Sequence, residues 1–390
     1  MPTPAELSPA LDHLAAIHRL RHRYVLDSPQ GRALTTADQA LVSFASNDYL
    51  GLANHPEVIA ALQHGAAQWG AGAGASALVN GHLRPHATLE HTLAQWLQAE
   101  AGLLFGDGFL ANIGVIPALV GRGDAIFADR LNHASLNAAA QLSRAQLHRF
   151  HHNDMSQLRH LLANSEAKCK LIAVDAVYSM DGDEAPLADL LQLAEEHHAW
   201  LYIDDAHGFG VLGAGKGTLF EQGVLSASSQ LPEQVVVMAT LGKAAGVAGA
   251  VVVGSQSLIT WLENRAATAI YTTAPPPALA CALLASLALI RDNTAQQRLQ
   301  NHIAFFREAT TGLPWPILPS RTPIQAVVIG EDKQALAVSQ QLRQQGFWVP
   351  AIRPPTVPEG SARLRISLSA AHQQADIAAL VAALWQIAQS

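Results

Sequence analysis

The chain is poor in cysteine, with only Cys169 and Cys281 among its 390 residues. Neither belongs to a CxxC pair or to another spacing typical of metal ligands. The sequence therefore predicts neither a disulfide framework nor a zinc or other metal site. Unpaired thiols suit a reducing compartment, and we expect the protein in the cytoplasm.

Basic residues are scarce as well. The chain has 24 Lys and Arg against 31 Asp and Glu, which gives a formal net charge of -7. A non-specific nucleic-acid binder carries an excess of basic residues, so this balance argues against nucleic acid as a partner. Local basic sites are compatible with this net charge.

Long apolar runs are missing too. The longest, residues 278–290, follows Pro275, Pro276 and Pro277. It is too short to cross about 30 Å of bilayer hydrocarbon, so we expect a buried helix that begins at proline and packs between domains or subunits. Residues 1–30 interrupt their apolar positions with His and Arg, unlike a signal peptide. We expect no membrane partner and a mature chain that begins near Met1.

What the chain has is a large apolar content, 49% of residues against 14% charged, which is enough for about two or three globular domains. Short β-branched runs alternate with Ala/Leu-rich stretches, which predicts an α/β fold with a mostly parallel central sheet and helices on both faces. The expected strands are residues 170–174, 200–203, 234–239 and 249–253, with a helix at 187–197.

The residue composition of the sequence changes after residue 290. A polar helix, a Pro-rich stretch, a strand at residues 324–329 and helices at 333–345 and from 375 predict a smaller α+β domain. We therefore expect three parts: an N-terminal arm (residues 1–46), mostly helical over its first 40 residues, a large domain (47–285) and a small C-terminal domain (286–390).

Two acids and a histidine follow the apolar strand expected at residues 200–203: Asp204, Asp205 and His207. Open α/β sheets bind ligands at the carboxyl ends of their strands. A carboxylate buried there needs a cation, and a protonated pyridine nitrogen is one. The alternative is that Asp204 caps the next helix while His207 faces solvent.

A lysine stands among small residues after the next expected strand. Lys243 follows Gly242 and precedes Ala244, so a cofactor could approach the backbone closely. Partial burial near a cationic ring would lower the pKa of its amine, which suits a Schiff-base lysine. The alternative is an ordinary surface lysine in a Gly-rich loop.

A glycine turn at residues 105–109 leads into an apolar helix and could present backbone N–H groups to a phosphate. Two similar patterns fail on context. Residues 208–213 match GxGxxG, but no long helix follows them, and the P-loop-like run that ends at Lys216 continues with Gly217 in place of Ser or Thr.

Six short motifs follow one another along the chain, at residues 47–52, 108–109, 129–136, 178–183, 204–208 and 240–243. Each is weak alone, but in this order they are specific. They resemble the alpha-oxoamine synthases, which are fold-type-I pyridoxal-phosphate transferases, and the resemblance covers nearly the whole chain. Residues 353–358 and 363–366 are similar to the branch of this family that uses alanine rather than glycine.

The resemblance implies a site for pyridoxal 5′-phosphate. Lys243 would carry the cofactor as a Schiff base, Asp204 would pair with its pyridinium nitrogen, and His207 would contact its ring hydroxyl. His133 would stack on the ring, so these four residues are the expected catalytic set. The other expected cofactor contacts are Gly108, Phe109, Ser179, Thr240 and, in a homodimer with a shared active site, Thr272 or Thr273 of the partner subunit.

The resemblance also implies the reaction. The family branch condenses L-alanine with a pimeloyl thioester, carried by coenzyme A or by acyl carrier protein, and releases carbon dioxide and the free thiol in biotin synthesis. Arg365 would bind the carboxylate of alanine beside Thr356 and His133, and Arg21 would lie near the acyl substrate. A guanidinium suits this role because it pairs bidentately with a carboxylate.

The chain departs from the family pattern at two points. Ala77 follows Ser76 where relatives usually carry arginine, and Asp175-Ala176 stands where they usually have an acidic residue and glycine. The first departure concerns a subunit interface and the second the backbone near the thioester entrance. Neither falls on a cofactor motif.

Three other interpretations compete with this hypothesis. A relative that uses glycine and a different acyl-CoA would keep the same cofactor residues. An aminotransferase would move an amino group without releasing carbon dioxide or thiol. A catalytically silent protein on this fold would have no need for both Lys243 and Asp204.

Overall fold

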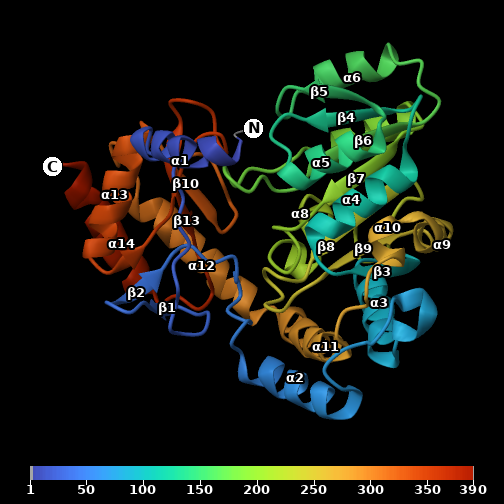
Figure 1. Cartoon of the computed structure of the whole chain (residues 1–390), viewed down its shortest axis with the longest axis horizontal. Coiled ribbons are helices and arrows are strands. Elements are labelled where there is room, and N and C mark those ends of the chain that lie inside the picture. The colour runs from blue at the N-terminus through green and yellow to red at the C-terminus, as the bar shows by residue number, and fades with distance from the viewer. Residues whose placement is uncertain (1–2, 390) are drawn as a thin grey trace. The chain divides into compact units, whose positions relative to one another are not determined.

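The computed structural model describes residues 3–389, and their contacts divide the chain into two units (Figure 1). Unit 1 contains the chain up to Tyr49, the short segment Met180–Gly182 and the chain from Arg298 onward. Unit 2 contains Leu50–Ser179 and Asp183–Gln297. The boundaries expected after residues 46 and 285 stay a prediction. We describe each unit by itself.

Unit 2 is built on a seven-stranded sheet with strand order β3-β9-β8-β7-β6-β4-β5. Strands β4 to β8 pair in parallel, whereas β9 runs antiparallel to both β8 and β3. The strands are β3 (Ala101–Phe105), β4 (Ala125–Asp129), β5 (Gln146–Phe150), β6 (Lys170–Asp175), β7 (Trp200–Asp204), β8 (Val235–Thr240) and β9 (Ala250–Gly254).

The central strands are buried along their whole length. Every residue of β4 and β9 is buried, and β6, β7 and β8 each have one partly exposed position at an end. Because successive side chains of a strand point to opposite faces, this burial means that both faces of the sheet are covered. The expected α/β fold with a mostly parallel sheet is confirmed, and so are its four predicted strands.

The helices of unit 2 include the expected helix at residues 187–197, which is α7. They are α2 (Pro56–Trp69), α3 (Arg84–Trp96), α4 (Gly108–Leu119), α5 (Ala134–Ser143), α6 (Met155–Ala163), α7 (Leu187–Glu196), α8 (Thr218–Glu221), α9 (Gln256–Arg265), α10 (Ala267–Ile270) and α11 (Pro277–Asp292), with single turns η2 (Ala77–Gly81) and η3 (Gly213–Gly215).

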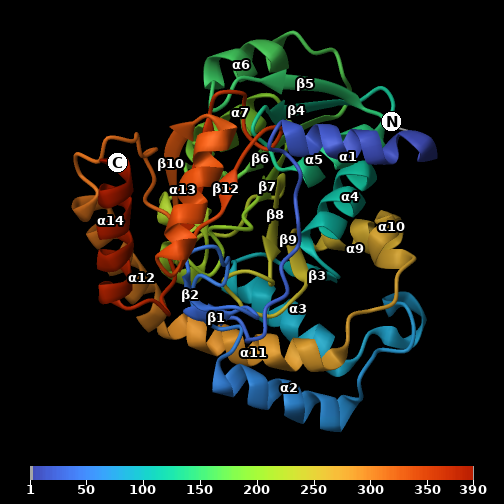
Figure 2. The same ribbon diagram turned by 60° about the vertical axis from the view of Figure 1, so that its left-hand side comes forward.

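The apolar run at residues 278–290 forms α11, which begins at Pro277 as predicted. This helix packs along α2 and against α3, and Figure 2 shows it beside α2. The crossing is close because α2 has Gly65 at the contact: a Cβ atom there would lie 2.8 Å from Cβ of Cys281 and 3.0 Å from Cα of Ala278.

Unit 1 contains two three-stranded sheets. Strands β10, β13 and β12 form an antiparallel sheet, and β1, β2 and β11 form the other. The elements are η1 (Pro4–Glu6), α1 (Leu7–Ala16), β1 (Ala33–Thr35), β2 (Ala40–Ser43), β10 (Ile324–Gly330), α13 (Asp332–Gln344), β11 (Phe347–Trp348), β12 (Ala351–Ile352), β13 (Ala362–Ser367) and α14 (Gln374–Ala388). Helix α12 (Thr294–Ala309) carries the boundary between the units.

The N-terminal arm differs from the expectation of a mostly helical segment. Helix α1 ends at Ala16, residues 17–32 form no helix, and β1 and β2 follow. Beyond Ala16, residues of the arm line a cavity together with β11 and β12, so tertiary contacts rather than helix propensity decide its conformation there.

No single helix in residues 3–389 is long and apolar enough to cross a membrane, although α11 and α12, bent by 60°, pass that test together by length and composition. Helix α11 has eight buried residues, as the core helix of a folded domain does.

Candidate functional site

Polar side chains stand at the carboxyl ends of four neighbouring parallel strands in unit 2. Strands β4, β6, β7 and β8 end at Asp129, Asp175, Asp204 and Thr240. In the strand register, Asp175 pairs with Asp204, and Asp204 pairs with Met238. Three carboxylates therefore meet at the edge of the sheet where α/β proteins bind ligands.

A cavity of about 170 Å³ lies at this edge. It brings together eight of the residues predicted from the sequence: Gly108, Phe109, His133, Ser179, Asp204, His207, Thr240 and Lys243. Ser135, Asp175, Ala206 and Met238 complete the lining. The cavity therefore draws its walls from segments that are more than a hundred residues apart in sequence.

Asp204 is buried, with 4% of its surface exposed. Its Oδ2 accepts a hydrogen bond from Nδ2 of Asn112 at 2.8 Å, and its Oδ1 accepts one from the backbone N–H of Ala206 at 3.1 Å. Burial raises the pKa of its carboxyl above the ordinary value, although Lys243 and the Asn112 bond act in the opposite direction. A cation in the cavity would stabilise the ionised form.

Asp205, the next residue, has a structural role. Its carboxylate accepts hydrogen bonds from the hydroxyl of Thr218 at 2.6 Å and from its backbone N–H at 2.8 Å, at the start of α8. Burial raises the pKa of Asp205 to about 6. Of the two adjacent acids, Asp204 lines the cavity and Asp205 does not.

Lys243 lies in the turn after β8, and its Nζ is 2.8 Å from Nε2 of His207. An ammonium group only donates, so in this contact the imidazole nitrogen accepts or the amine has given up its proton. In the first arrangement the imidazole is the proton acceptor, and in the second the amine is. The pair can therefore exchange a proton inside the cavity.

A chain of hydrogen bonds determines the tautomer of His133. The hydroxyl of Tyr202 donates to Oδ1 of Asn112, and Nδ2 of Asn112 donates to Oγ of Ser135, each at 2.7 Å. Oγ of Ser135 is 2.7 Å from Nδ1 of His133, and the backbone N–H of Ser135 donates to the same nitrogen at 3.3 Å. Nδ1 therefore accepts, which leaves the proton on Nε2. Burial lowers the pKa of His133, although the charge of Asp204 acts in the opposite direction, and this favours the neutral ring.

Asp175 holds the backbone of the same turn. Its Oδ2 accepts a hydrogen bond from the backbone N–H of His133 at 2.6 Å, and its own N–H donates to Oδ1 of Asn132 at 3.2 Å. Burial raises the pKa of this carboxyl well above its usual range, and the neighbouring Asp204 adds to the rise. At neutral pH, the fully buried pair therefore resists carrying two negative charges.

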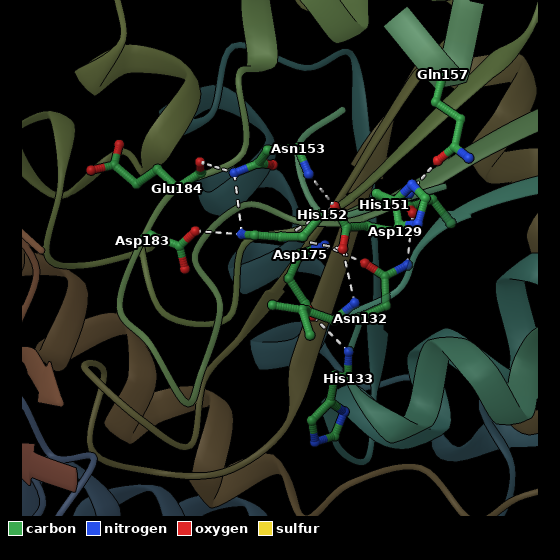
Figure 3. A network of polar contacts seen from close by, with 12 residues as sticks. Asp129, Asn132, His133, His151, His152, Asn153, Gln157, Asp175, Asp183 and Glu184 are labelled. Atoms are coloured by element: carbon green, nitrogen blue, oxygen red, sulfur yellow. Dashed lines mark hydrogen bonds and ion pairs between the residues drawn. The ribbon is translucent and has the colours of Figure 1, made fainter. Parts of the chain in front are cut away.

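A charged histidine lies behind this turn (Figure 3). Nδ1 of His152 is 3.1 Å from Oδ1 of Asp129, and Nε2 is 2.5 Å from Oδ2 of Asp183. Burial alone would lower the pKa of His152, but the hydrogen bonds to the two carboxylates outweigh it and raise the pKa to about 10. The imidazolium thus ties the end of β4 to the loop that follows Ser179.

The first turn of α4 is a possible anion site. The side chain of Asp107 caps the helix by accepting from the backbone N–H of Leu110 at 2.7 Å. Gly108 and Phe109 precede Leu110, and the first N–H groups of a helix have no intrahelical partner. Because both residues line the cavity, this helix end can receive a phosphate there.

The remaining predicted residues lie elsewhere. Thr272 stands between α10 and α11 in unit 2. Among the described residues 3–389, it is not one of those that line this cavity. Arg21, Thr356 and Arg365 belong to unit 1, where Nη2 of Arg21 donates to Oγ1 of Thr356 at 3.0 Å. Arg365 is buried and donates from Nη1 to Oδ1 of Asn47 at 3.1 Å.

Sequence reasoning missed Asn112, Ser135, Asp175 and His152 as parts of this site. Asn112 carried a usable signal, because it is the one amide side chain in the otherwise apolar first half of α4 and is fully buried. Asp175 ends a strand in the same way as Asp204 does. His152 gave no signal, since its two partners come from distant parts of the chain.

Comparisons with known proteins agree on one family. The family model for aminotransferase class I and II matches residues 39–384. The 8-amino-7-oxononanoate synthase of Chromobacterium violaceum is 54% identical over 386 residues, which cover 99% of each chain. The enzyme of the same name from Herminiimonas arsenicoxydans is 53% identical and covers 93% of this chain and 94% of its own.

Solved structures with the same fold include serine palmitoyltransferase (SPT). A high-resolution structure of SPT with pyridoxal phosphate superimposes with a TM-score of 0.90 at 26% identity and covers 99% of this chain and 96% of its own. The 8-amino-7-oxononanoate synthase of Francisella tularensis gives a TM-score of 0.76 at 28% identity, with 90% and 98% covered.

Proposed function

Because the chain belongs to the aminotransferase class I and II family and, within it, to the 8-amino-7-oxononanoate synthases, we propose that it condenses L-alanine with a pimeloyl thioester. The products are 8-amino-7-oxononanoate, carbon dioxide and the free thiol, in biotin synthesis. The observation that carries this proposal is the cavity in which Lys243, His207, Asp204 and His133 come together.

The residues around the cavity fit pyridoxal phosphate. Asp204 is a buried carboxylate whose pKa stays raised although Lys243 and Asn112 act to lower it, and a protonated pyridine nitrogen beside it would stabilise its charge further. Lys243 offers a primary amine, and the first turn of α4 offers N–H groups to the phosphate. When bound, the cofactor supplies an aldehyde that takes up amines and a ring that stabilises a carbanion.

Lys243 would hold the aldehyde in the resting enzyme and give it up to the amino group of alanine. The freed amine can then remove the proton from Cα of alanine, since a primary amine is a base. His207, 2.8 Å from Nζ, can accept or return a proton at this point. Asp204 would keep the ring nitrogen protonated throughout.

His133 would cover the ring as a neutral imidazole with its proton on Nε2. A neutral ring adds no second cation beside the pyridinium, and the Nε2–H group stays available to a substrate oxygen. Ser179 and Thr240, which line the same cavity, would border the ring and the phosphate.

Three residues of unit 1 are proposed to bind the substrates. Arg365 would pair with the carboxylate of alanine, beside Thr356. Arg21, which donates to Thr356, would lie near the acyl chain. The hydrogen bond between Arg21 and Thr356 supports a common substrate region within this unit.

We further propose a homodimer with a shared active site. Several large apolar side chains of unit 2 are exposed, among them Leu78 at 61%, Val79 at 77% and Tyr271 at 84%. Tyr271 directly precedes Thr272, the residue proposed to reach the phosphate of the other subunit. A second copy that covers these side chains would remove them from water. The cytoplasm is the proposed location.

The test is product analysis with the purified protein loaded with pyridoxal phosphate. Alanine, glycine and serine are each supplied with pimeloyl-CoA and with palmitoyl-CoA, and the products are identified by mass spectrometry. Alanine with the pimeloyl thioester should give the fastest release of thiol and a product of the mass of 8-amino-7-oxononanoate. A preference for serine with palmitoyl-CoA, or for glycine, would contradict the proposed substrates.

A further inference from the structure

Unit 1 contains a second cavity, of about 600 Å³, between the N-terminal arm and the chain from α13 to Arg353. Six residues between 15 and 24, among them His18, Arg21 and Tyr24, form one wall, and residues between 336 and 353 form the other. Arg353 donates to the backbone carbonyl of His18, and this bond connects the two walls. A volume of this size is typical of a site for a small molecule.

The cavity is basic although the chain as a whole has a net charge of -7. Arg21, Arg343 and Arg353 line it, together with His18 and His22, and there is no Asp or Glu among its lining residues within the described chain. We call this cavity the arginine groove. Arg19 lies outside it and is already paired with Asp332 at 3.0 Å and with Glu359. The arginines of the groove therefore gather without a carboxylate between them.

The gathered charges interact unfavourably. Burial lowers the pKa of Arg353, and the nearby charge of Arg21 lowers it further, while Asp332 compensates in part. An arginine remains protonated under such conditions, so the cost falls on the stability of the groove. An anion bound there would relieve the repulsion, which is the reason to expect one.

Arg343 is held in a fixed orientation. Its guanidinium carbon lies 4.7 Å from the ring centre of Tyr24 and 4.6 Å from that of Trp348. The two rings meet edge to face with centroids 5.0 Å apart. These cation–π contacts hold the guanidinium beside the two rings, and the N–H groups that do not face a ring can contact an oxyanion. Phosphate oxygens match this geometry.

Resting on the proposed function, we propose that the arginine groove binds the phosphate esters of the thioester carrier, with coenzyme A as their source. The groove is concave and lined by arginines and aromatic rings, which suits a nucleotide phosphate better than the surface of a protein does. Arg21 connects the groove to the proposed substrate residues through its bond to Thr356. The groove therefore selects the carrier, whereas the cofactor cavity carries out the chemistry.

The first experiment measures binding without turnover. The probe is 3′-phosphoadenosine 5′-diphosphate, which is the nucleotide part of coenzyme A, titrated calorimetrically into the full-length protein loaded with pyridoxal phosphate. Arg343→Gln and Arg353→Gln should each weaken binding about tenfold, as the loss of a charge-assisted contact does. Arg291→Gln is the matched control, because Arg291 also stacks on an aromatic ring, Trp96 at 4.9 Å, but lies outside the groove.

The second experiment measures turnover with three thioesters of the same acid. With pimeloyl-CoA, the two groove variants should raise KM about tenfold and leave kcat within about twofold. With pimeloyl-N-acetylcysteamine, which has no phosphate, they should behave as wild type. The third thioester is carried on acyl carrier protein. The change in cofactor absorbance on adding alanine, unaltered in all variants, shows that the fold and the amino-acid site are intact.

The outcomes separate the two proposals. Equal probe affinity in wild type and groove variants would overturn the groove as a phosphate site. If the variants impair turnover only with the thioester on acyl carrier protein, the groove docks that protein and the proposal is overturned. Equal losses of turnover with pimeloyl-CoA and with the phosphate-free thioester would also overturn it. A wild-type protein that binds the probe through Arg343 and Arg353 but frees no thiol would support the groove and contradict the proposed function.

Discussion

Nδ2 of Asn112, in the middle of α4, lies 2.8 Å from Oδ2 of Asp204, at the end of β7. Both side chains are buried, and Asn112 uses both N–H donors, since it also donates to Ser135, while its Oδ1 accepts from Tyr202. One amide thus orients the acid of the cavity and, through Ser135, the imidazole of His133.

Asn112→Ala removes the hydrogen bond that lowers the pKa of Asp204, so this pKa should rise. The acid limb of the pH profile of turnover should therefore move to higher pH, and turnover at neutral pH should fall about tenfold, the equivalent of one net hydrogen bond. Asn164→Ala, which changes an exposed asparagine at the end of α6, is the control. A lower melting temperature with an unmoved pH profile would reduce Asn112 to a packing residue.

Asp204→Asn keeps the shape of the side chain and removes its charge. Turnover should fall by at least about 100-fold, because the ring nitrogen loses the anion that holds its proton. In wild type, the cofactor should bind less tightly as the pH falls through the raised pKa of Asp204, since the protonated acid must release its proton before it can pair. Cofactor titration across pH checks this, and in the variant that dependence should disappear.

Lys243→Ala should lose turnover by about 10² to 10⁴, the typical cost of a missing general base, and sodium borohydride should no longer fix the cofactor to the protein. Mass mapping of the reduced wild-type protein should find the added mass on the peptide with Lys243. Lys216→Ala is the matched control, because Lys216 stacks on Trp96 and Phe220 outside the cavity. Near-normal turnover of Lys243→Ala would contradict its assigned role.

His152→Gln tests the charged histidine between Asp129 and Asp183. Because the pKa of His152 is raised from 6.5 to about 10 in the folded protein, the pair contributes its full stability below pH 6.5 and loses it as the pH rises through 10. At pH 6, the variant should lose about 2 to 3 kcal/mol of unfolding free energy in urea, discounted for partial exposure.

The same urea titrations at pH 9.5 should narrow the gap between wild type and His152→Gln, because the wild type has lost part of the stabilisation there. His64→Gln, on the exposed face of α2, should match wild type at both pH values. A gap of constant size across this range would contradict the charged state.

Arg365→Lys keeps the positive charge and removes the two-pronged contact. KM for alanine should rise about 10- to 100-fold while KM for the thioester stays unchanged, because a lysine offers a point charge in place of a planar fork. Arg307→Lys is the control, since Arg307 binds the carbonyl of Leu318 and the side chain of Gln325 in the same unit. An unaltered KM for alanine would contradict the proposed carboxylate contact.

Local patterns predicted the strands of the central sheet and singled out Asp204 and Lys243. The expectation that His133, Ser179 and Thr240 lie near them came from the family resemblance. The strand that ends at Asp204 and the turn that holds Lys243 both carry their chemistry next to a regular element, where periodicity is readable. The arm was predicted less well, because residues 17–32 follow contacts with distant strands rather than their own propensity.

The support of the cavity could not be predicted in this way. Asn112 reaches Asp204 across 92 positions of sequence, and His152 joins Asp129 to Asp183 across 23 and 31. These pairs depend on the order of the strands in the sheet, which a single sequence does not give. The same holds for the arginine groove, whose walls are about 300 positions apart in the chain.

The most direct test of the account follows the carboxyl carbon of alanine. The purified wild-type protein, loaded with pyridoxal phosphate, is given alanine labelled at that carbon, with and without pimeloyl-CoA, and labelled carbon dioxide and free thiol are counted together. Labelled carbon dioxide and free thiol should appear in equal amounts, only when both substrates are present, and not in Lys243→Ala. Transfer of the amino group to a keto acid without labelled carbon dioxide would contradict it.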